Sequence, residues 1–592
     1  MEQAVAKLGF HLITTSDQRT WRSGLPIVFL GEWCKPYHLQ HSWSKLDHIV
    51  AKPYGLGEKK YLDYEFSKTI QNRLLEVLKV KLNSIHNVNY DIRSWKIILG
   101  HWLNRYTDVL INRYNTLREC LNDHEIESTT LFKNDKYFLA SKDSLSFIWS
   151  CNDPVWNNVL FGKLLSFISD QNIKELECSF EIPEKKGEEV KETYKAKIRK
   201  TIMGIYERLS SIFVRESDFL LISSYFPVFI EFILQLKLFQ FPKIWRTSST
   251  KIEAEYDSAL RKNLTNEIAK TEFEGVPLYF LSLLFEMMPI CFLEGFKEVT
   301  RQADLLPWPS KPRFVFTSNC FDTDEIFKRW ISEKIHTGSK YYVGQHGNNY
   351  GTYRFNNPTV EEDTADKFIA WGNWAKEYSV HRTGFVFKSL RAKRMEHDPS
   401  GDLLLIELSL PHLIRTWDVY AEHHEYFEEQ KRFVSLLKPS IKKDLVIRLH
   451  REFIQRDWSE DIRWKDFNPD LKIDLGITHN INLLRKSRLA VHSYDSTGIL
   501  ETLSLNFPTL AFWANEFDHL RESAIPYYRM LEEVGILHLS PESCARHINS
   551  IWQDVGNWWL SEKVQGARRE FCLQFALMTE RPVALLTEIF ES

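Results

Sequence analysis

Cysteine is scarce in this chain of 592 residues, which has eight scattered cysteines and no Cys-x-x-Cys pair. A disulfide framework and a cysteine-based zinc site are therefore excluded as organising elements, and reduced thiols in a cytoplasmic protein are favoured. The first residues also lack a basic segment followed by an apolar one, so we expect no signal peptide.

Long apolar runs are missing as well. Phe219–Phe241 and Pro277–Phe296 are the most apolar stretches, and charged residues interrupt both. Because a membrane-spanning helix needs about 20 apolar residues, we expect no span and interpret both stretches as buried elements. Peripheral contact with the inner face of a membrane stays open.

The chain has no strong excess of charge of either sign, with 76 Lys and Arg against 79 Asp and Glu. A protein that grips nucleic acid needs a basic surface, so we expect no nucleic-acid partner. Aromatic residues are abundant at 14%. They can build large cores or stack on sugars and bases, and their number alone does not choose between these uses.

Short apolar strands alternate with helical stretches, most clearly after residue 307, and this pattern predicts an α/β fold with parallel sheets. We expect an N-terminal α/β domain over residues 1–385, with a large helical insertion at about 65–300. A Rossmann-like domain should follow over 400–560. A C-terminal helix over 561–592 should pack back on the N-terminal domain.

The most informative segment is the hydroxyl-rich turn His492–Glu501, which lies between a predicted strand and a predicted helix. Free N–H groups at the start of that helix could bind a phosphate, and Glu501 could bind two ribose hydroxyls. Ordinary capping by Ser496 is the alternative. The donor-binding candidates in this turn are His492, Ser493, Asp495, Ser496, Thr497, Gly498 and Glu501.

A second candidate lies at the end of another predicted strand, where Arg448 and His450 precede Arg451. Cationic side chains at such a strand end could bind a phosphate or a carboxylate. A surface cluster without function is the alternative. We include Arg448 and His450 among the candidate donor-binding residues.

A glycine-rich loop follows a third predicted strand and carries His346, which could act as a general base. The loop residues expected near a ligand are Gly344, Gln345, Gly347, Asn348 and Asn349. A turn with a structural histidine is the alternative.

Glu32, between Gly31 and Trp33 at the end of the first strand, is a second candidate for the base, unless it only caps the next element. Asp322 and Asp324 resemble a metal-binding Asp-x-Asp motif, but capping of the following helix is favoured. His101 and Arg105 fit a packed helix or the wall of an acceptor pocket. We expect no metal site and no cofactor.

The last 280 residues resemble the nucleotide-binding half of GT-B glycosyltransferases, in particular of enzymes that use CMP- or CDP-activated donors. Tyr494–Gly498 resembles the Asp-Tyr-Ser-Ser turn of teichoic-acid glycerophosphotransferases, and Gln345–Gly347 resembles their His-Gly loop. Arg448–His450 stands where bacterial sialyl- and Kdo-transferases carry a His-Pro pair, although Arg451 replaces the proline here.

Four further segments resemble a family of bacterial transferases from O-antigen and surface-carbohydrate gene clusters, and this likeness runs over nearly the whole chain. The segments are Phe29–Cys34, Pro53–Gly57, Gly344–Asn349 and Arg521–Ile536.

These resemblances imply a GT-B-like fold with two Rossmann-like domains that face a cleft. They imply a metal-independent glycosyltransferase of surface-polysaccharide biosynthesis. The expected donor is a nucleotide-sugar, in particular a CMP-activated ulosonic acid, and the expected acceptor is a carbohydrate or a lipid-linked hydroxyl. Transfer of a polyol phosphate from a CDP-donor and a non-catalytic carbohydrate-assembly scaffold remain the alternatives.

Overall fold

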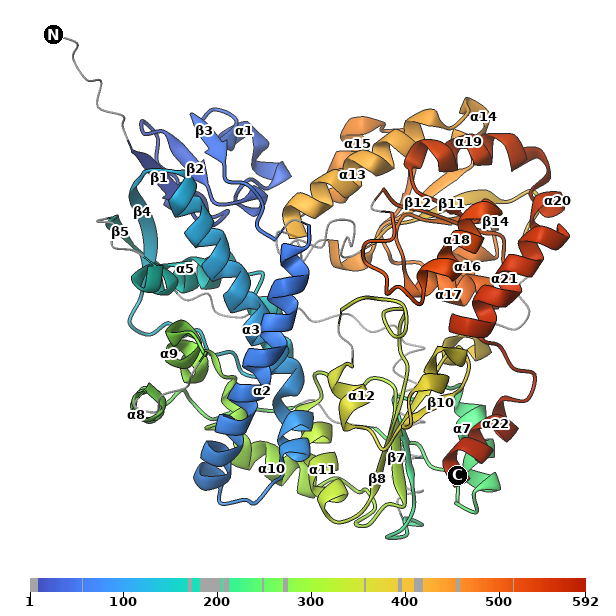
Figure 1. Cartoon of the computed structure of the whole chain (residues 1–592), viewed down its shortest axis with the longest axis horizontal. Coiled ribbons are helices and arrows are strands. Elements are labelled where there is room, and N and C mark those ends of the chain that lie inside the picture. The colour runs from blue at the N-terminus through green and yellow to red at the C-terminus, as the bar shows by residue number, and fades with distance from the viewer. Residues whose placement is uncertain are drawn as a thin grey trace.

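The chain folds around three parallel sheets, which Figure 1 shows as separate groups of strands joined by long helices. The computed structural model describes residues 9–55, 57–168, 173–181, 204, 206, 212–246, 250–269, 275–355, 358–391, 397–408, 419–453, 458–514 and 516–592. The α/β class and the parallel sheets expected from the sequence are confirmed.

The first sheet has the order β3-β2-β1-β4-β5. Its strands are β1 (Phe10–Ile13), β2 (Ile27–Phe29), β3 (His48–Val50), β4 (Ile126–Lys133) and β5 (Lys174–Ser179). Its helices are α1 (Gln40–Trp43), α2 (Lys59–His86), α3 (Ile92–Asp123), α4 (Ser144–Ser150) and α5 (Pro154–Ile168). A core that includes the apolar faces of α2, α3 and α5 fills the space beside this sheet.

Local backbone conformation and capping define where α2 ends and where α3 begins. Asn87, with a φ of 54°, closes α2 in the left-handed conformation. The carboxylate of Asp91 accepts a hydrogen bond from the Ser94 backbone N–H and so caps α3. Both helices run from the first sheet towards the second, and Figure 1 shows them side by side.

The second sheet has the order β10-β9-β8-β7-β6. Its strands are β6 (Leu220–Ile222), β7 (Phe314–Thr317), β8 (Lys340–Gly344), β9 (Lys367–Ala370) and β10 (His381–Thr383). The helices between β5 and β10 are α7 (Val228–Lys237), α8 (Ser258–Ala269), α9 (Leu278–Met287), α10 (Phe296–Asp304), α11 (Glu325–His336) and α12 (Val360–Thr364). Of these, α8 and α9 pack into the core beside the first sheet.

The region expected to be a helical insertion, residues 65–300, also contains strands. β4 and β5 complete the first sheet, and β6 is the edge strand of the second. The chain therefore has one parallel sheet more than the two we expected. β5 was hidden because its residues are largely polar and exposed, as an edge strand permits.

The third sheet has the order β13-β12-β11-β14-β15-β16, which is the Rossmann order 3-2-1-4-5-6. Its strands are β11 (Asp402–Ile406), β12 (Leu445–Arg448), β13 (Lys472–Asp474), β14 (Ser487–His492), β15 (Thr509–Phe512) and β16 (Leu537–His538). Its helices are α13 (Val419–Leu436), α14 (Pro439–Lys442), α15 (Glu460–Phe467), α16 (Asn480–Leu484), α17 (Thr497–Ser504), α18 (Ile525–Glu533), α19 (Pro541–Ile551) and α20 (Val555–Trp559).

The last two helices, α21 (Glu562–Phe575) and α22 (Pro582–Glu591), return to the second sheet. The Leu577 backbone N–H donates to the Trp371 carbonyl at 2.7 Å, and the Lys367 ammonium donates to the Ile589 carbonyl at 2.8 Å. Across the described residues, the model contains no helix with the length and apolarity needed to cross a bilayer.

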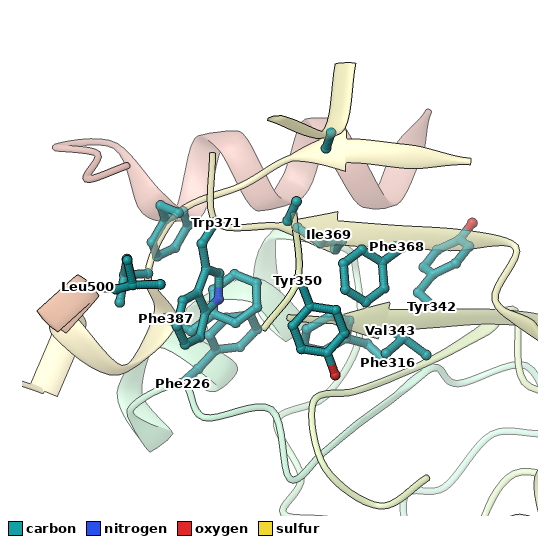
Figure 2. Close-up of a cluster of buried hydrophobic side chains, with 14 of the residues drawn as sticks. Phe226, Phe316, Tyr342, Val343, Tyr350, Phe368, Ile369, Trp371, Phe387 and Leu500 are labelled. Carbon is teal, nitrogen blue, oxygen red and sulfur yellow. The ribbon is translucent and has the colours of Figure 1, made fainter. Parts of the chain in front are cut away.

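One apolar core joins the second sheet to helices of the third. Phe316, Trp371 and Phe387 from the second sheet and its loops belong to the same buried cluster as Leu500 of α17. Figure 2 shows Leu500 beside Trp371 and Phe387. Because that helix begins with the candidate donor turn, this packing fixes the turn relative to the second sheet.

Candidate functional site

The two best sequence candidates meet in space. The loop after β8 lies against the turn after β14, and the Asn348 backbone N–H donates to the Thr497 hydroxyl at 3.2 Å. A Cβ added to Gly347 would lie 3.2 Å from the same hydroxyl, so the glycine permits this close approach. The loop that carries His346 is therefore in direct contact with the start of α17.

The buried side chain of Asp495 stabilises this contact through hydrogen bonds to both segments. Its carboxylate accepts hydrogen bonds from the Asn348 amide at 2.6 Å and from the Tyr528 hydroxyl at 2.9 Å, and lies 3.1 Å from the His519 ring. Its carbonyl accepts from the Tyr353 hydroxyl at 2.6 Å. The side chain is only 2% exposed, so Asp495 is a structural hub rather than a group that faces a ligand.

Backbone pairing adds to this junction. The Arg354 N–H donates to the His519 carbonyl, and the Arg521 N–H donates to the Thr352 carbonyl, both at 2.9 Å. Helix α2 reaches the same place, where the Lys60 ammonium lies 2.8 Å from the Asp518 carboxylate. Segments from all three parts of the chain thus converge beside the candidate site.

The start of α17 forms as the sequence predicted, but Ser496 does not cap it through its side chain. Its hydroxyl lies 3.4 Å from Nδ1 of His492 instead. The capping explanation is therefore not supported, and the first helical N–H groups keep the positive end of the dipole. Thr497 and Gly498 are partly exposed there.

His492 lies fully buried under α17, and a Cβ on Gly498 would clash with its ring at 2.6 Å. Burial lowers the pKa of His492 to about 3. Ser493 is buried too and contacts the hydroxyl of Tyr426 at 2.6 Å. These two candidates support the turn and do not reach the neighbouring cavity.

A cavity of about 460 Å³ opens beside α17, at the carboxyl ends of β12 and β13, and Glu501, Thr502 and Leu505 are the residues of that helix that line it. None of the residues 492–498 lines this cavity, so Ser496, Thr497 and Gly498 are not part of its wall. Its walls carry the cationic side chains of Lys388, Arg448 and Arg451, together with Glu501. Lys388 comes from the second sheet's side and lies 3.7 Å from the Glu501 carboxylate, so the cavity spans the seam between the two sheets. Burial raises the pKa of Glu501.

Arg448 is the most notable cation in this cavity. Its side chain is partly buried, and its Nε has no hydrogen-bond partner among the residues that the structure describes. Burial lowers the pKa of Arg448, because removing the positive charge from water is unfavourable. An anionic ligand would compensate this cost. His450 lies next to it, but it does not line the cavity.

His346 lines a second cavity, of about 280 Å³, between α2, α3 and the loop after β8. Asn349 lines it as well, whereas Gly344 and Gln345 are buried in packing contacts. Nδ1 of His346 lies 2.7 Å from the Tyr350 hydroxyl, and that hydroxyl donates to the carboxylate of Glu361. When Glu361 is ionised, this series of hydrogen bonds places the ring proton of His346 on Nδ1 and the lone pair on Nε2.

Burial shifts the pKa values of His346 and Glu361 in this series of hydrogen bonds. It lowers the pKa of His346 to about 4, and the positive charge of Lys388 contributes in the same direction. It also raises the pKa of Glu361 to about 7. His346 is therefore neutral near pH 7, as a general base must be before it accepts a proton.

Asp322 has a different role in this cavity from the one that its sequence neighbourhood predicts. Asp324 caps α11, as expected, by accepting from the Phe327 N–H at 2.9 Å. Asp322 does not cap that helix but pairs with Arg105 through two hydrogen bonds of 2.7 and 2.8 Å. His101 and Arg105 both line the cavity, so they are not confined to helix packing. The contact between Arg105 and Asp322 spans 217 positions, so no local pattern could reveal it.

Glu32, the other candidate base, lies elsewhere. It belongs to a short helical turn after β2 and lines a third cavity of about 440 Å³, which faces α13 and α15. Its carboxylate is 3.4 Å from the Lys35 ammonium. The cavity of Glu32 shares no lining residue with that of His346, so the structure does not bring the two candidates together.

Comparison with known families gives a match over nearly the full length. The profile described as LIC12162 family transferase matches residues 10–590. The chain belongs to this transferase family. No curated protein matches the chain.

Among solved structures, the rhamnosyltransferase SpnG is similar in two states. Its complex with spinosyn aglycone is 12% identical with a TM-score of 0.27, over 56% of this chain and 81% of SpnG. Its complex with thymidine diphosphate is 12% identical with a TM-score of 0.31, over 63% of this chain and 99% of SpnG. Likeness at this level is too weak to carry an argument about the family member's function.

Replacing Asp495 by Ala should destabilise the protein, because it removes a buried acceptor from Asn348 and Tyr528. We expect a loss of about 3–5 kcal/mol in the free energy of unfolding, measured by urea denaturation. The exposed Asp470→Ala variant is the control and should change stability by less than about 0.5 kcal/mol. Equal effects of the two variants would contradict the role of Asp495 as a hub.

Replacing Glu361 by Gln should change how stability depends on pH. The pKa of Glu361 is raised to about 7 in the folded protein, so the folded state holds this proton more tightly than the unfolded state does. The resulting contribution to the free energy of unfolding is present at low pH and is lost as pH rises towards 7. Between pH 5 and pH 8, Glu361→Gln should therefore gain about 2–3 kcal/mol relative to wild type. Asp363→Asn, on the same helix and more exposed, should follow wild type across this range. A parallel pH profile for Glu361→Gln would sink the assignment.

Proposed function

We propose that this transferase is a glycosyltransferase that binds a nucleotide-activated sugar in the cavity beside α17. The observation that carries the proposal is the contact between Thr497 and the loop of His346. Thr497 begins the helix whose Glu501 lines the proposed donor cavity, so this contact supports a donor site close to the candidate base. A transfer reaction needs this neighbourhood, because the acceptor oxygen must attack the carbon that bears the leaving phosphate.

The chemistry of the larger cavity fits a nucleotide. Lys388, Arg448 and Arg451 line the cavity and supply positive charge for the phosphate. Glu501 can accept hydrogen bonds from two ribose hydroxyls. The cavity lies beyond the carboxyl ends of strands in a Rossmann-ordered sheet, where such sheets bind nucleotides.

In the proposed reaction, an acceptor hydroxyl enters from the cavity of His346. Nε2 takes the hydroxyl proton while the oxygen bonds to the anomeric carbon of the donor, and the bond from that carbon to the phosphate oxygen breaks. The leaving nucleotide keeps the bonding electrons, and the cations of its cavity stabilise the negative charge. One base and one displacement imply inversion at the anomeric carbon.

The finer identity of the substrates follows from the family resemblance. We propose a CMP-activated ulosonic acid as the donor and a carbohydrate or lipid-linked hydroxyl as the acceptor, in bacterial surface-polysaccharide biosynthesis in the cytoplasm. The phosphate of a CMP leaving group is negatively charged, and fixed cationic side chains can stabilise that charge as the group departs without a metal ion. The GT-B-like placement of donor and acceptor sites between lobes belongs to this proposal.

Transfer of a polyol phosphate from a CDP-donor remains the second candidate, because the loop with His346 resembles that of teichoic-acid enzymes. There the acceptor oxygen would attack phosphorus and CMP would leave. Analysis of products from CMP-ulosonic acids, CDP-polyols and NDP-hexoses separates the two reactions. A protein that binds none of these nucleotides would instead be a carbohydrate-assembly scaffold.

Replacing Arg448 by Met should weaken nucleotide binding about 10- to 100-fold, as expected when one charged phosphate contact is lost. Isothermal calorimetry with CMP, CDP and UDP measures this effect. Arg485→Met removes an exposed arginine outside the cavity and is the matched control. Unchanged affinity in Arg448→Met would place the nucleotide elsewhere.

Replacing His346 by Ala should lower the rate of transfer at least about 100-fold while nucleotide affinity stays within a few-fold of wild type. Glu32→Gln should leave the rate nearly unchanged, because Glu32 lines a different cavity. Single-turnover measurements with saturating donor test both variants. A large loss in Glu32→Gln together with an active His346→Ala would assign the base to Glu32.

A further inference from the structure

Helix α7 is apolar on two opposite faces. Ile230, Leu234 and the following Leu238 are buried against the second sheet. On the other side, Phe229 is 60% exposed and Leu236 is 61% exposed. Large apolar side chains on a helix face are normally covered, so the outer face of α7 requires an explanation.

The exposed apolar surface extends beyond the helix. We name it the α7 patch, and its members are Ile212, Phe213, Val228, Phe229, Ile233, Leu236, Phe239 and Phe241. Phe239 is the most exposed at 87%, and the rings of Phe213 and Phe241 lie 5.0 Å apart. Contiguous apolar surfaces of this kind mark places where a protein binds a partner or a membrane.

Four exposed cationic residues lie on or close in the structure to the segments that carry the patch. Lys237 lies on the helix itself and is exposed, as are Arg215, Lys311 and Arg313. Backbone and side-chain contacts keep these residues local: Lys311 N–H donates to the Glu216 carbonyl, and the Arg313 guanidinium donates to the Leu238 carbonyl. Two acids belong to the same region, the exposed Glu216 and the partly buried Glu231 of α7, so four cations stand against two acids.

Aromatic and aliphatic side chains that project between lysine and arginine are typical of helices that lie in the headgroup region of a bilayer. We propose that the α7 patch docks this protein on a membrane surface that contains anionic lipids. The apolar side chains would enter the boundary between headgroups and acyl chains, and the surrounding cations would attract the negative surface.

The position of the patch supports this occupant. Tyr225, three residues before Val228, lines the larger cavity together with Lys388, and the Lys388 ammonium lies 4.8 Å from its ring. Figure 1 shows α7 at the outer edge of the second sheet, beside α22. Docking through α7 would therefore bring the proposed donor cavity close to the bilayer surface. Only this last link rests on the proposed function.

Vesicle co-sedimentation tests the docking site. The full chain should bind vesicles of phosphatidylglycerol and phosphatidylethanolamine and should bind phosphatidylcholine vesicles much less. The double variant Phe229→Ser, Leu236→Ser should lower binding to the anionic vesicles at least about tenfold. Lys237→Gln with Lys311→Gln should lower it several-fold, and added salt should reduce this difference.

The matched control is Leu62→Ser with Val80→Ser, which removes two exposed apolar side chains from α2, 70% and 65% exposed. It should bind vesicles as wild type does. Absence of wild-type binding, or an equal loss in this control, would overturn the proposal. Light scattering measures whether the wild-type protein is a dimer. A wild-type dimer that becomes a monomer in the Phe229 and Leu236 double variant would assign the patch to a second copy of the chain and overturn the proposal.

Nucleotide affinity provides the distinction from the proposed function. The Phe229 and Leu236 double variant should bind CMP as wild type does in calorimetry. A protein that binds vesicles through the patch but binds no nucleotide would leave the docking site standing and refute the proposed glycosyl transfer. The reverse result would refute only the docking site.

Discussion

The buried carboxylate of Asp495 is the interaction on which the candidate site depends. It connects the turn before α17 with the loop after β8 and with Tyr528 of α18. Without an acceptor at this position, the Asn348 amide and the Tyr528 hydroxyl would be buried unpaired, at a cost too large for a marginally stable chain to ignore. The contact between the two candidate motifs is thus a consequence of satisfying a buried charge.

This constraint also limits which parts can move. The second and third sheets share one apolar core through Leu500 and are joined by backbone hydrogen bonds near Thr352. Opening a hinge between them would expose that core to water, which is unfavourable in proportion to the apolar area. The first sheet meets the third through smaller polar contacts, such as the 2.8 Å hydrogen bond from the Tyr37 hydroxyl to Asp466. Relative movement of the sheets is therefore easier at that seam, which borders the cavity of Glu32.

The sequence predicted the third sheet well because its strands are short, apolar and buried, and because glycine and hydroxyl residues mark the turn at 492–498. It predicted the first sheet poorly, since β4 carries Thr129 and Thr130 and β5 is polar at an exposed edge. Local pattern could identify His346 and Thr497 as candidates. It could not show that Asn348 and Asp495, 147 positions apart, bring them into contact.

The same limit explains the two candidate bases. Glu32 and His346 each follow a strand and each carry a group that can accept a proton, so local sequence could not rank them. Only the fold places His346 against Tyr350 and Glu361, and Glu32 against Lys35. A histidine whose Nδ1 is held by a partner presents a defined Nε2, whereas the Glu32 carboxylate already pairs with the Lys35 ammonium.

Electrostatics couples the two cavities in a way that suits ordered transfer. Lys388 lines the larger cavity, and its charge helps to lower the pKa of His346 in the smaller one. If a donor phosphate binds Lys388 as proposed, its negative charge offsets that effect, because opposite charges at short range cancel at a third group. His346 would then be a stronger base with the donor bound than without it. Proton removal from the acceptor would be favoured only when an activated sugar is present to receive the oxygen.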